Sequence, residues 1–208
     1  MSAEEVLEQI KKWFEVGDEK AKDIVELPWE VKVYDVEGRK VIEAINPRMP
    51  IKFYALLIAG KDVVRIAVKT GFETVYLDSD TRLKIYRDAL LGNDSLPLMK
   101  YVLMPPNDEL ALAVDLSIYT LGEKEFNNAL TALFVGLSLA ASKLGMGEVL
   151  ARDLMKTLAE MINERIKKGY SPEELVKFLV EKVGMEEGEA RGLIEKIVGK
   201  GRPSPWIM

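Results

Sequence analysis

The chain has 208 residues with a net charge of −5; 48% of its residues are hydrophobic and 30% are charged. This length and composition are typical of a globular protein with one full domain, or with one domain and a small appendage. The negative charge argues against a broad electrostatic surface for nucleic acid, so we do not expect nucleic acid as a partner.

Cysteine and histidine are both absent from the sequence. Without cysteine there is no disulfide, no thiolate nucleophile and no cysteine-bound zinc. Without histidine the commonest general base and the commonest metal ligand are missing, which excludes Ser-His-Asp hydrolysis and H-E-x-x-H metalloproteases. We therefore expect a protein that holds no cofactor and no transition metal. Any chemistry would have to rest on carboxylates, Lys, Tyr, Ser or Thr.

The composition also bears on source and location. Gln9 is the only glutamine, whereas Glu and Lys are abundant. This hyperthermophile pattern favours a thermophilic archaeon, with chance composition as the alternative. Residues 2–8 are acidic and lack the basic and apolar regions of a signal peptide. The most apolar window, residues 129–141, is shorter than the ~20 residues that cross a bilayer, so we expect a cytoplasmic protein without membrane contact.

The first part of the chain predicts a helix followed by four strands. Ser2 and Glu5 have the spacing of a capping box, and the helix that they open ends at Gly17. Glu37 and Gly38 suit the tight turn of the first hairpin. The expected strands are residues 29–34, 40–45, 51–58 and 63–68. The third of these is apolar on both faces, which is typical of a central strand.

A short helix and a second hairpin follow. The helix is expected over residues 80–91, with Asp78 in a capping position and a stop at Gly92 and Asn93. The hairpin is expected over residues 99–118. In its last strand, apolar residues alternate with small or polar ones, as in an antiparallel sheet with one wet face; the apolar set is Leu110, Leu112, Val114, Leu116 and Ile118.

The last part of the chain predicts helices only. Thr120 and Glu123 repeat the capping-box spacing and open a long helix that ends near Gly145. A glycine-rich joint then leads to charged amphipathic helices over residues 148–168, 172–183 and 186–198. The domain boundaries that follow are 1–146 for an α+β domain, 147–200 for a small helical module and 201–208 for a Pro-rich tail. We expect the helical module to be semi-independent.

The long helix after Gly122 is apolar almost all round between residues 129 and 141. Such a helix must be covered on all sides, and one small sheet covers only one side. Small residues four apart permit close approach of another helix. We therefore expect an interface on this helix, and two covers are open: a second copy in a homodimer, or the C-terminal helices of the same chain. The interface residues are Ala132, Leu133, Gly136, Leu137 and Ala140.

One motif has the form of a metal site. Asp78-Ser79-Asp80 is a D-x-D sequence, although carboxylates at a helix start are more often caps that complement the helix dipole. With Asp94 it supports an alternative function, an enzyme that uses carboxylates and a divalent metal. A buried cluster with raised pKa values would favour the enzyme, and solvated caps would favour a binding protein.

The order of elements over residues 1–144 resembles the type III secretion chaperone-like fold, and in particular the YbjN-like family of small sensory-transduction or chaperone-like proteins. Residues 87–93 (RDALLGN) resemble an "LL-x-N" segment of that family, and residues 108–118 resemble its following strand. The resemblance implies a homodimer that binds partner polypeptides and is not an enzyme. The helices after Gly147 depart from the pattern, which puts in doubt whether the usual dimer or binding surface is free.

Together these observations predict an α+β fold, with a mainly antiparallel sheet flanked by helices and a C-terminal all-α module. The expected function is that of a non-catalytic, chaperone-like protein that acts through protein–protein interaction. The sequence does not identify the protein partner.

Overall fold

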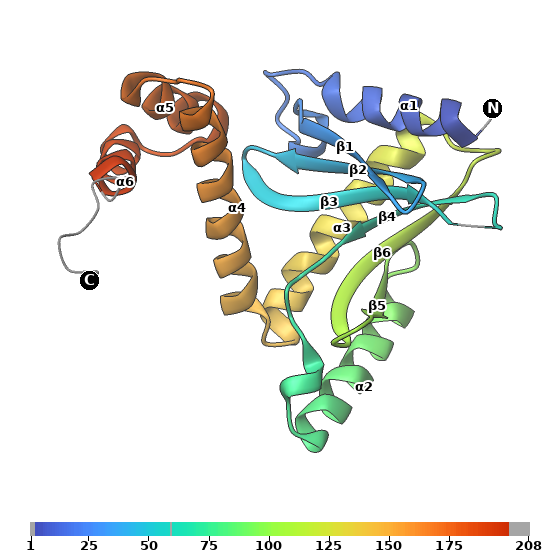
Figure 1. Cartoon of the computed structure of the whole chain (residues 1–208). Helices are drawn as coiled ribbons and strands as arrows, with labels where there is room; N and C mark the ends of the chain where they lie inside the picture. Colours follow the sequence, from blue (N-terminus) through green and yellow to red (C-terminus); the bar gives the residue numbers. More distant parts are fainter. Residues whose placement is uncertain (1–2, 59, 200–208) are drawn as a thin grey trace.

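The computed structural model describes residues 3–58 and 60–199 of the chain. It contains one six-stranded, fully antiparallel sheet in the order β1-β2-β3-β4-β6-β5 (Figure 1). The strands are β1 (Glu30–Val36), β2 (Arg39–Asn46), β3 (Met49–Leu57), β4 (Val63–Val68), β5 (Lys100–Met104) and β6 (Glu109–Ser117). The helices are α1 (Ala3–Glu15), α2 (Ser79–Ser95), α3 (Glu123–Lys143), α4 (Gly147–Lys167), α5 (Pro172–Phe178) and α6 (Glu187–Gly199). The predicted α+β class is confirmed.

Tight turns set the register of the hairpins. Glu37 and Gly38 both have positive φ angles, of 54° and 76°, which match the twist of the flanking strands β1 and β2. Asp108 has a φ of 50° in the turn between β5 and β6. Both turns were predicted. The proposed N-cap Ser2 lies outside the described residues.

Helices α1 and α3 cover one face of the sheet with an aromatic core. Ring centroids lie 4.8 Å apart for Phe14 and Phe126, and 5.1 Å apart for Phe53 and Phe134. Trp29 packs between these groups, 5.1 Å from Phe14 and 5.0 Å from Phe53. Aromatic residues bury large areas, so this cluster fixes α1 and α3 against the sheet.

The small-residue strip of α3 faces the sheet. A Cβ atom on Gly136 would lie 2.6 Å from both Leu112 Cδ2 and Met99 Cε, and the Gly136 carbonyl oxygen accepts a hydrogen bond from the Tyr101 hydroxyl at 3.0 Å. Leu133, Leu137 and Ala140 are buried in the same core, and Ala132 is partly buried against it. Gly136 is thus covered by the sheet of its own chain, and the other predicted interface residues lie in or against the same core; an interface on this helix stays a prediction.

A different line of residues on α3 is exposed to solvent. Its exposed members are Asn128, Thr131, Val135, Ser138 and Ser142, which recur at three- and four-residue spacing. The two polar interruptions of the apolar window, Thr131 and Ser138, therefore mark the solvent side. The expected N-cap at Thr120 is wrong: α3 begins at Glu123 with Gly122 as its N-cap and without a side-chain cap.

Helix α2 extends beyond its predicted C-terminal end. It runs through the expected stop at Gly92 and Asn93 and ends at Ser95. The Asn93 side chain pairs with the Tyr101 backbone, accepting from the nitrogen at 2.6 Å and donating to the carbonyl at 3.3 Å. A Cβ on Gly92 would lie 2.9 Å from the Tyr101 ring. Contact with β5 therefore explains both residues, and neither acts as a helix terminator.

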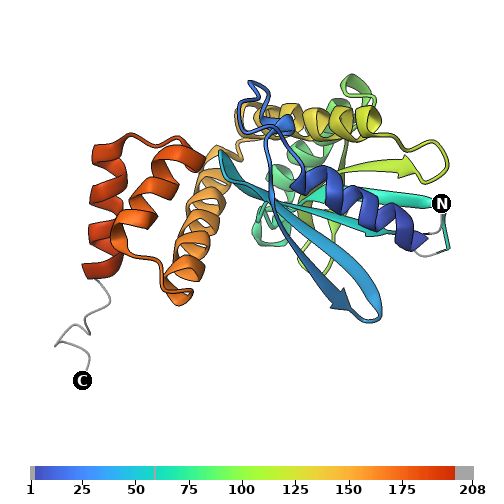
Figure 2. The same ribbon diagram turned by 90° about the horizontal axis from the view of Figure 1, so that it is seen from above.

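The C-terminal helices form a separate cluster beside the sheet, as Figure 2 shows from above. Helix α4 lies against the sheet face opposite to α1 and α3, where it contacts β3. Helix α5 follows its N-cap Ser171, which makes both hydrogen bonds of a capping box, and it continues into a π-helical turn, Leu179–Val183. A three-residue turn that starts with Gly184, at a φ of 83°, leads into α6.

Candidate functional site

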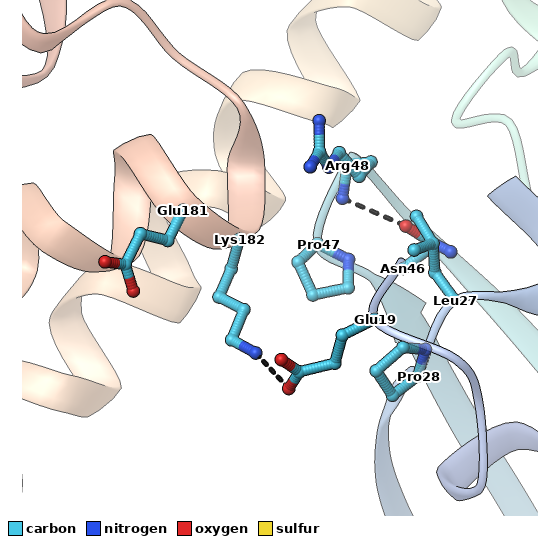
Figure 3. Close-up of a pocket in the computed structure, with 8 residues that line it drawn as sticks. All are labelled: Glu19, Leu27, Pro28, Asn46, Pro47, Arg48, Glu181 and Lys182. Atoms are coloured by element: carbon cyan, nitrogen blue, oxygen red, sulfur yellow. Dashed lines mark hydrogen bonds and ion pairs between the residues drawn. The ribbon is translucent and has the colours of Figure 1, made fainter. Parts of the chain in front are cut away.

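A cleft runs along the junction between the sheet and the C-terminal helices. It consists of two adjoining pockets, of about 500 and 270 Å³. Figure 3 shows the smaller one, with the loop between α1 and β1 and the β2–β3 turn on one wall, and the end of α5 with its π-helical turn on the other. The residues shared by both pockets are Glu19, Pro28, Pro47, Glu181 and Lys182. We refer to these two pockets together as the cleft.

Asn46 fixes the wall contributed by the sheet. Its side chain is fully buried, donates to the Ile24 carbonyl oxygen at 2.7 Å and accepts from the Arg48 backbone nitrogen at 2.9 Å. The pairing of β2 with β3 shifts register at this residue. These bonds tie the α1–β1 loop to the β2–β3 turn, so Pro47 and Arg48 are held toward the C-terminal helices (Figure 3).

The larger pocket has an apolar lining. Arg165 on α4 supports it: its guanidinium carbon lies 3.6 Å from the centre of the Phe178 ring, and its nitrogens donate to the Met161 carbonyl oxygen and to the Glu30 carboxylate. This arrangement combines a cation–π contact with an ion pair, and it orients Phe178. The apolar lining residues are Pro28, Trp29, Pro47, Tyr170 and Phe178.

Charges of both signs border the cleft. Lys182 pairs with Glu19 across it, and Lys177 approaches Glu181 at 3.9 Å on the same helix. The Arg48 guanidinium is exposed beside Gly184 and makes no ion pair with any residue that the structure describes. Four carboxylates and four cations line the two pockets together, so the cleft has no net charge.

A third cavity, of about 200 Å³, lies between α4 and the sheet. Lys52 bonds Glu160 at 2.6 Å and Lys32 bonds Glu164, so two ion pairs span it. The hydrogen bond from Lys32 holds the pKa of Glu164 below its usual value. Burial raises the pKa of the neighbouring Asp153. The lowered pKa of Glu164 is typical of a structural ion pair, and the raised pKa of Asp153 is typical of a partly buried acid.

The carboxylates of the alternative enzyme site do not converge. Asp78 caps α2, accepting from the Thr81 backbone nitrogen at 2.9 Å and from its hydroxyl at 2.6 Å, and these bonds lower the pKa of Asp78. Asp80 and Asp94 are separated by 14 positions of the same helix, or about 21 Å along its axis. Within the described residues there is no group of three or more Asp and Glu side chains that could hold a metal.

Sequence reasoning missed the cleft. Nothing local in the sequence around Pro28 and Pro47 shows that α5 returns to these loops. The charged residues of α5 looked like an ordinary solvated face. A weak signal was available in Tyr170 and Phe178, two aromatic residues at the junction of otherwise charged helices.

No helix in the described part of the chain is long and apolar enough to span a membrane.

Comparison with known proteins gives two matches to family models. Residues 145–205 match HTH_78, described as a domain of unknown function. No curated protein matches the chain. Residues 9–144, more than half of the chain, match the model described as domain of unknown function DUF8183, and the protein therefore belongs to that family.

Proposed function

We propose that the protein is a non-catalytic binding protein that holds an extended segment of a partner polypeptide in the cleft. The observation that carries the proposal is the larger pocket: a volume of about 500 Å³ whose lining includes the exposed Tyr170 and the half-buried Pro28 beside the buried Trp29, Pro47 and Phe178, with charged residues of both signs around them. Aromatic and proline surfaces bind extended peptides, especially proline-containing ones, through flat apolar contacts. Paired charges at a rim contribute specificity more than affinity.

The cleft contains none of the groupings that catalysis requires. Hydrolytic sites need a nucleophile within hydrogen-bond reach of a base, and metal-assisted sites need converging ligands. Six of the eight charged cleft residues are instead engaged with one another, as in Lys182 with Glu19 and Arg165 with Glu30. This engagement favours binding over the alternative carboxylate and metal enzyme. The chaperone-like role and the cytoplasmic location are expectations from the sequence, and they agree with a peptide-binding cleft.

Nucleic acid binding is the second candidate, because the label of the C-terminal family model abbreviates helix-turn-helix. Helices α5 and α6, joined by a turn with Gly184, have the arrangement of that motif. In DNA-binding members the start of the second helix approaches the DNA. Here that start carries Glu187 and Glu189, and Arg191 is engaged with Glu187 at 2.7 Å. An acidic approach surface repels phosphates, so a protein partner is favoured.

The test is selection of peptides from a displayed random library on the full chain. We expect bound peptides to lose about tenfold in affinity when Tyr170 is replaced by Ala, since an aromatic anchor typically contributes about 1–2 kcal/mol. Tyr119→Ala is the matched control, because Tyr119 is exposed on the β6–α3 connection and does not line the cleft. Selected peptides whose affinity is the same for both variants would refute the cleft as the binding site.

The nucleic acid alternative has its own measurement. Fluorescence anisotropy with a labelled random DNA duplex at low salt should give no saturable change, because the acidic start of α6 opposes phosphate binding. Saturable binding that disappears as salt is raised would contradict the proposal and favour the helix-turn-helix interpretation.

A further inference from the structure

Large apolar side chains gather on the outer surface of α2. Leu83, Leu90 and Leu91 are 67, 69 and 55% exposed, although α2 packs against β5 through its other side. The buried residues of α2 are instead Ile85 and Ala89. Tyr76, Leu98 and Leu103, which lie in the segments that flank α2 and on β5, are also exposed. Exposed apolar side chains that gather on one helix are typical of interaction sites in soluble proteins.

The exposed leucines belong to a segment whose other members have structural roles. Gly92 lies against the Tyr101 ring, and Asn93 closes the edge of β5 through its two bonds to the Tyr101 backbone. Leu90 and Leu91 precede them directly, and their exposure leaves them without a comparable role inside the chain.

The exposed face of α2 has the spacing of a helix-pairing seam. Leu83, Arg87, Leu90 and Asp94 follow one another at intervals of four, three and four residues, as in the seam of a coiled coil. Arg87 and Asp94 are exposed, and neither makes an ion pair with a residue that the structure describes. No opposite charge stands three or four positions away from either one on α2, so the helix itself cannot neutralise them.

We propose that this face binds a second copy of the chain, with the two α2 helices packed antiparallel about the step between Leu90 and Leu91. Arg87 and Asp94 lie 3.5 positions to either side of that midpoint and on the same face of the helix. A twofold axis there brings Arg87 of one copy opposite Asp94 of the other, twice. Leu90 of each copy then packs on Leu91 of the other. The antiparallel orientation also sets opposite ends of the two helix dipoles side by side.

The size of the surface sets the expected affinity. Helix α2 has 17 residues, which gives a length of about 25 Å, and a helix with its side chains is about 10–12 Å wide. The helix alone thus buries about 300 Å² per copy, and the surrounding apolar residues add to it. This is below the ~800 Å² per partner of standard tight interfaces. We therefore expect a dimer with a dissociation constant in the micromolar range.

Sedimentation equilibrium of the full chain from 1 to 500 µM tests the proposal. We expect the mass to rise from monomer to dimer over this range. Leu90→Glu should weaken dimerisation at least tenfold, because it places like charges at the twofold axis. Val135→Glu is the control: Val135 is an exposed apolar residue on the exposed side of another helix, α3, so its replacement should leave the mass unchanged. Both variants should retain the circular dichroism melting curve of the unmodified chain.

A charge exchange tests the arrangement itself. Arg87→Asp and Asp94→Arg should each weaken dimerisation severalfold, whereas the double variant should recover the affinity of the unmodified chain to within about threefold. A monomer at 500 µM would overturn the proposal, and so would a dimer that Leu90→Glu does not weaken. Failure of the double variant to recover would overturn the antiparallel pairing. None of these outcomes depends on the cleft, because the dimer proposal rests on α2 alone.

Discussion

Replacing Gly136 by Ala tests how α3 packs on the sheet. Alanine is favoured over glycine in a helix interior by about 1 kcal/mol. Here the added methyl group would lie 2.6 Å from Leu112 Cδ2 and Met99 Cε, both of which belong to fully buried side chains. Overpacking of a tight core typically costs about 1–3 kcal/mol. The two terms oppose each other, and we expect a net loss of about 1 kcal/mol in the free energy of unfolding.

The same change at an unobstructed helical glycine provides the control. On Gly192 of α6 an added Cβ meets nothing within 4 Å, so Gly192→Ala should show the helix gain alone, up to about 1 kcal/mol. The assay is guanidinium unfolding followed by circular dichroism, with the difference between the two variants as the measured quantity. In a thermal scan, a change of 1 kcal/mol shifts the melting temperature of a chain of this size by about 2–4 °C, so the melting temperatures of the two variants should differ by several degrees. If Gly136→Ala stabilises as much as Gly192→Ala does, the described contact between α3 and the sheet is wrong.

Three further predictions concern other parts of the fold. Bonds from Arg65, at 2.6 and 2.8 Å, hold the pKa of Asp115 at about 2, below its value in the unfolded chain. The stability that this carboxylate provides is therefore present above pH 4 and is lost as the pH falls toward 2. In denaturant titrations, Asp115→Asn should lower the free energy of unfolding by about 1–2 kcal/mol at pH 7 and leave it unchanged near pH 2. Asn93→Ala should leave the Tyr101 backbone unpaired and cost about 1–3 kcal/mol by the same assay, and an unchanged midpoint would argue against this pairing. Limited proteolysis should cut first within residues 145–147, and resistance there with cleavage elsewhere would contradict a semi-independent helical module.

The sequence predicted the strands better than it predicted what each helix covers. Period-two alternation and turn residues are local signals, so the β1–β2 and β5–β6 hairpins could be located from residues such as Gly38 and Asp108. The buried sides of α2 and α3 could not be inferred in this way. Both helices carry apolar residues on more than one side, and which side is buried depends on contacts with β5 and β6.

Two individual positions show why local signals misled. Gly92 and Asn93 are a standard stop signal, yet the helix continues past both. The Asn93 side chain bonds the Tyr101 backbone, and Gly92 leaves room for the Tyr101 ring, so both positions are explained by a contact between separate elements. Gly136 looked like part of a smooth helix-contact strip, but it is small because the sheet approaches it closely. The cleft could not be predicted for the same reason: it forms where α5 meets loops more than 120 positions earlier in the chain.

The way in which the C-terminal helices attach explains why the cleft lies where it does. The start of α4 belongs to the main core through Met146 and Leu150, whereas the far end of α4 packs with α5 and α6 in a second core. Ile45 is the one buried residue of the sheet in that second core, within the described part of the chain.

Ion pairs also cross the junction, among them Arg165 with Glu30, Lys52 with Glu160 and Lys182 with Glu19. Ion pairs of this partly exposed kind each contribute about 0–1 kcal/mol and are screened by salt. A junction held by a few such pairs, with three cavities along it, separates more easily than an apolar interface of the same length. We therefore propose that an incoming peptide replaces these pairs with contacts of its own while both cores stay intact, in keeping with the proposed binding function of the cleft.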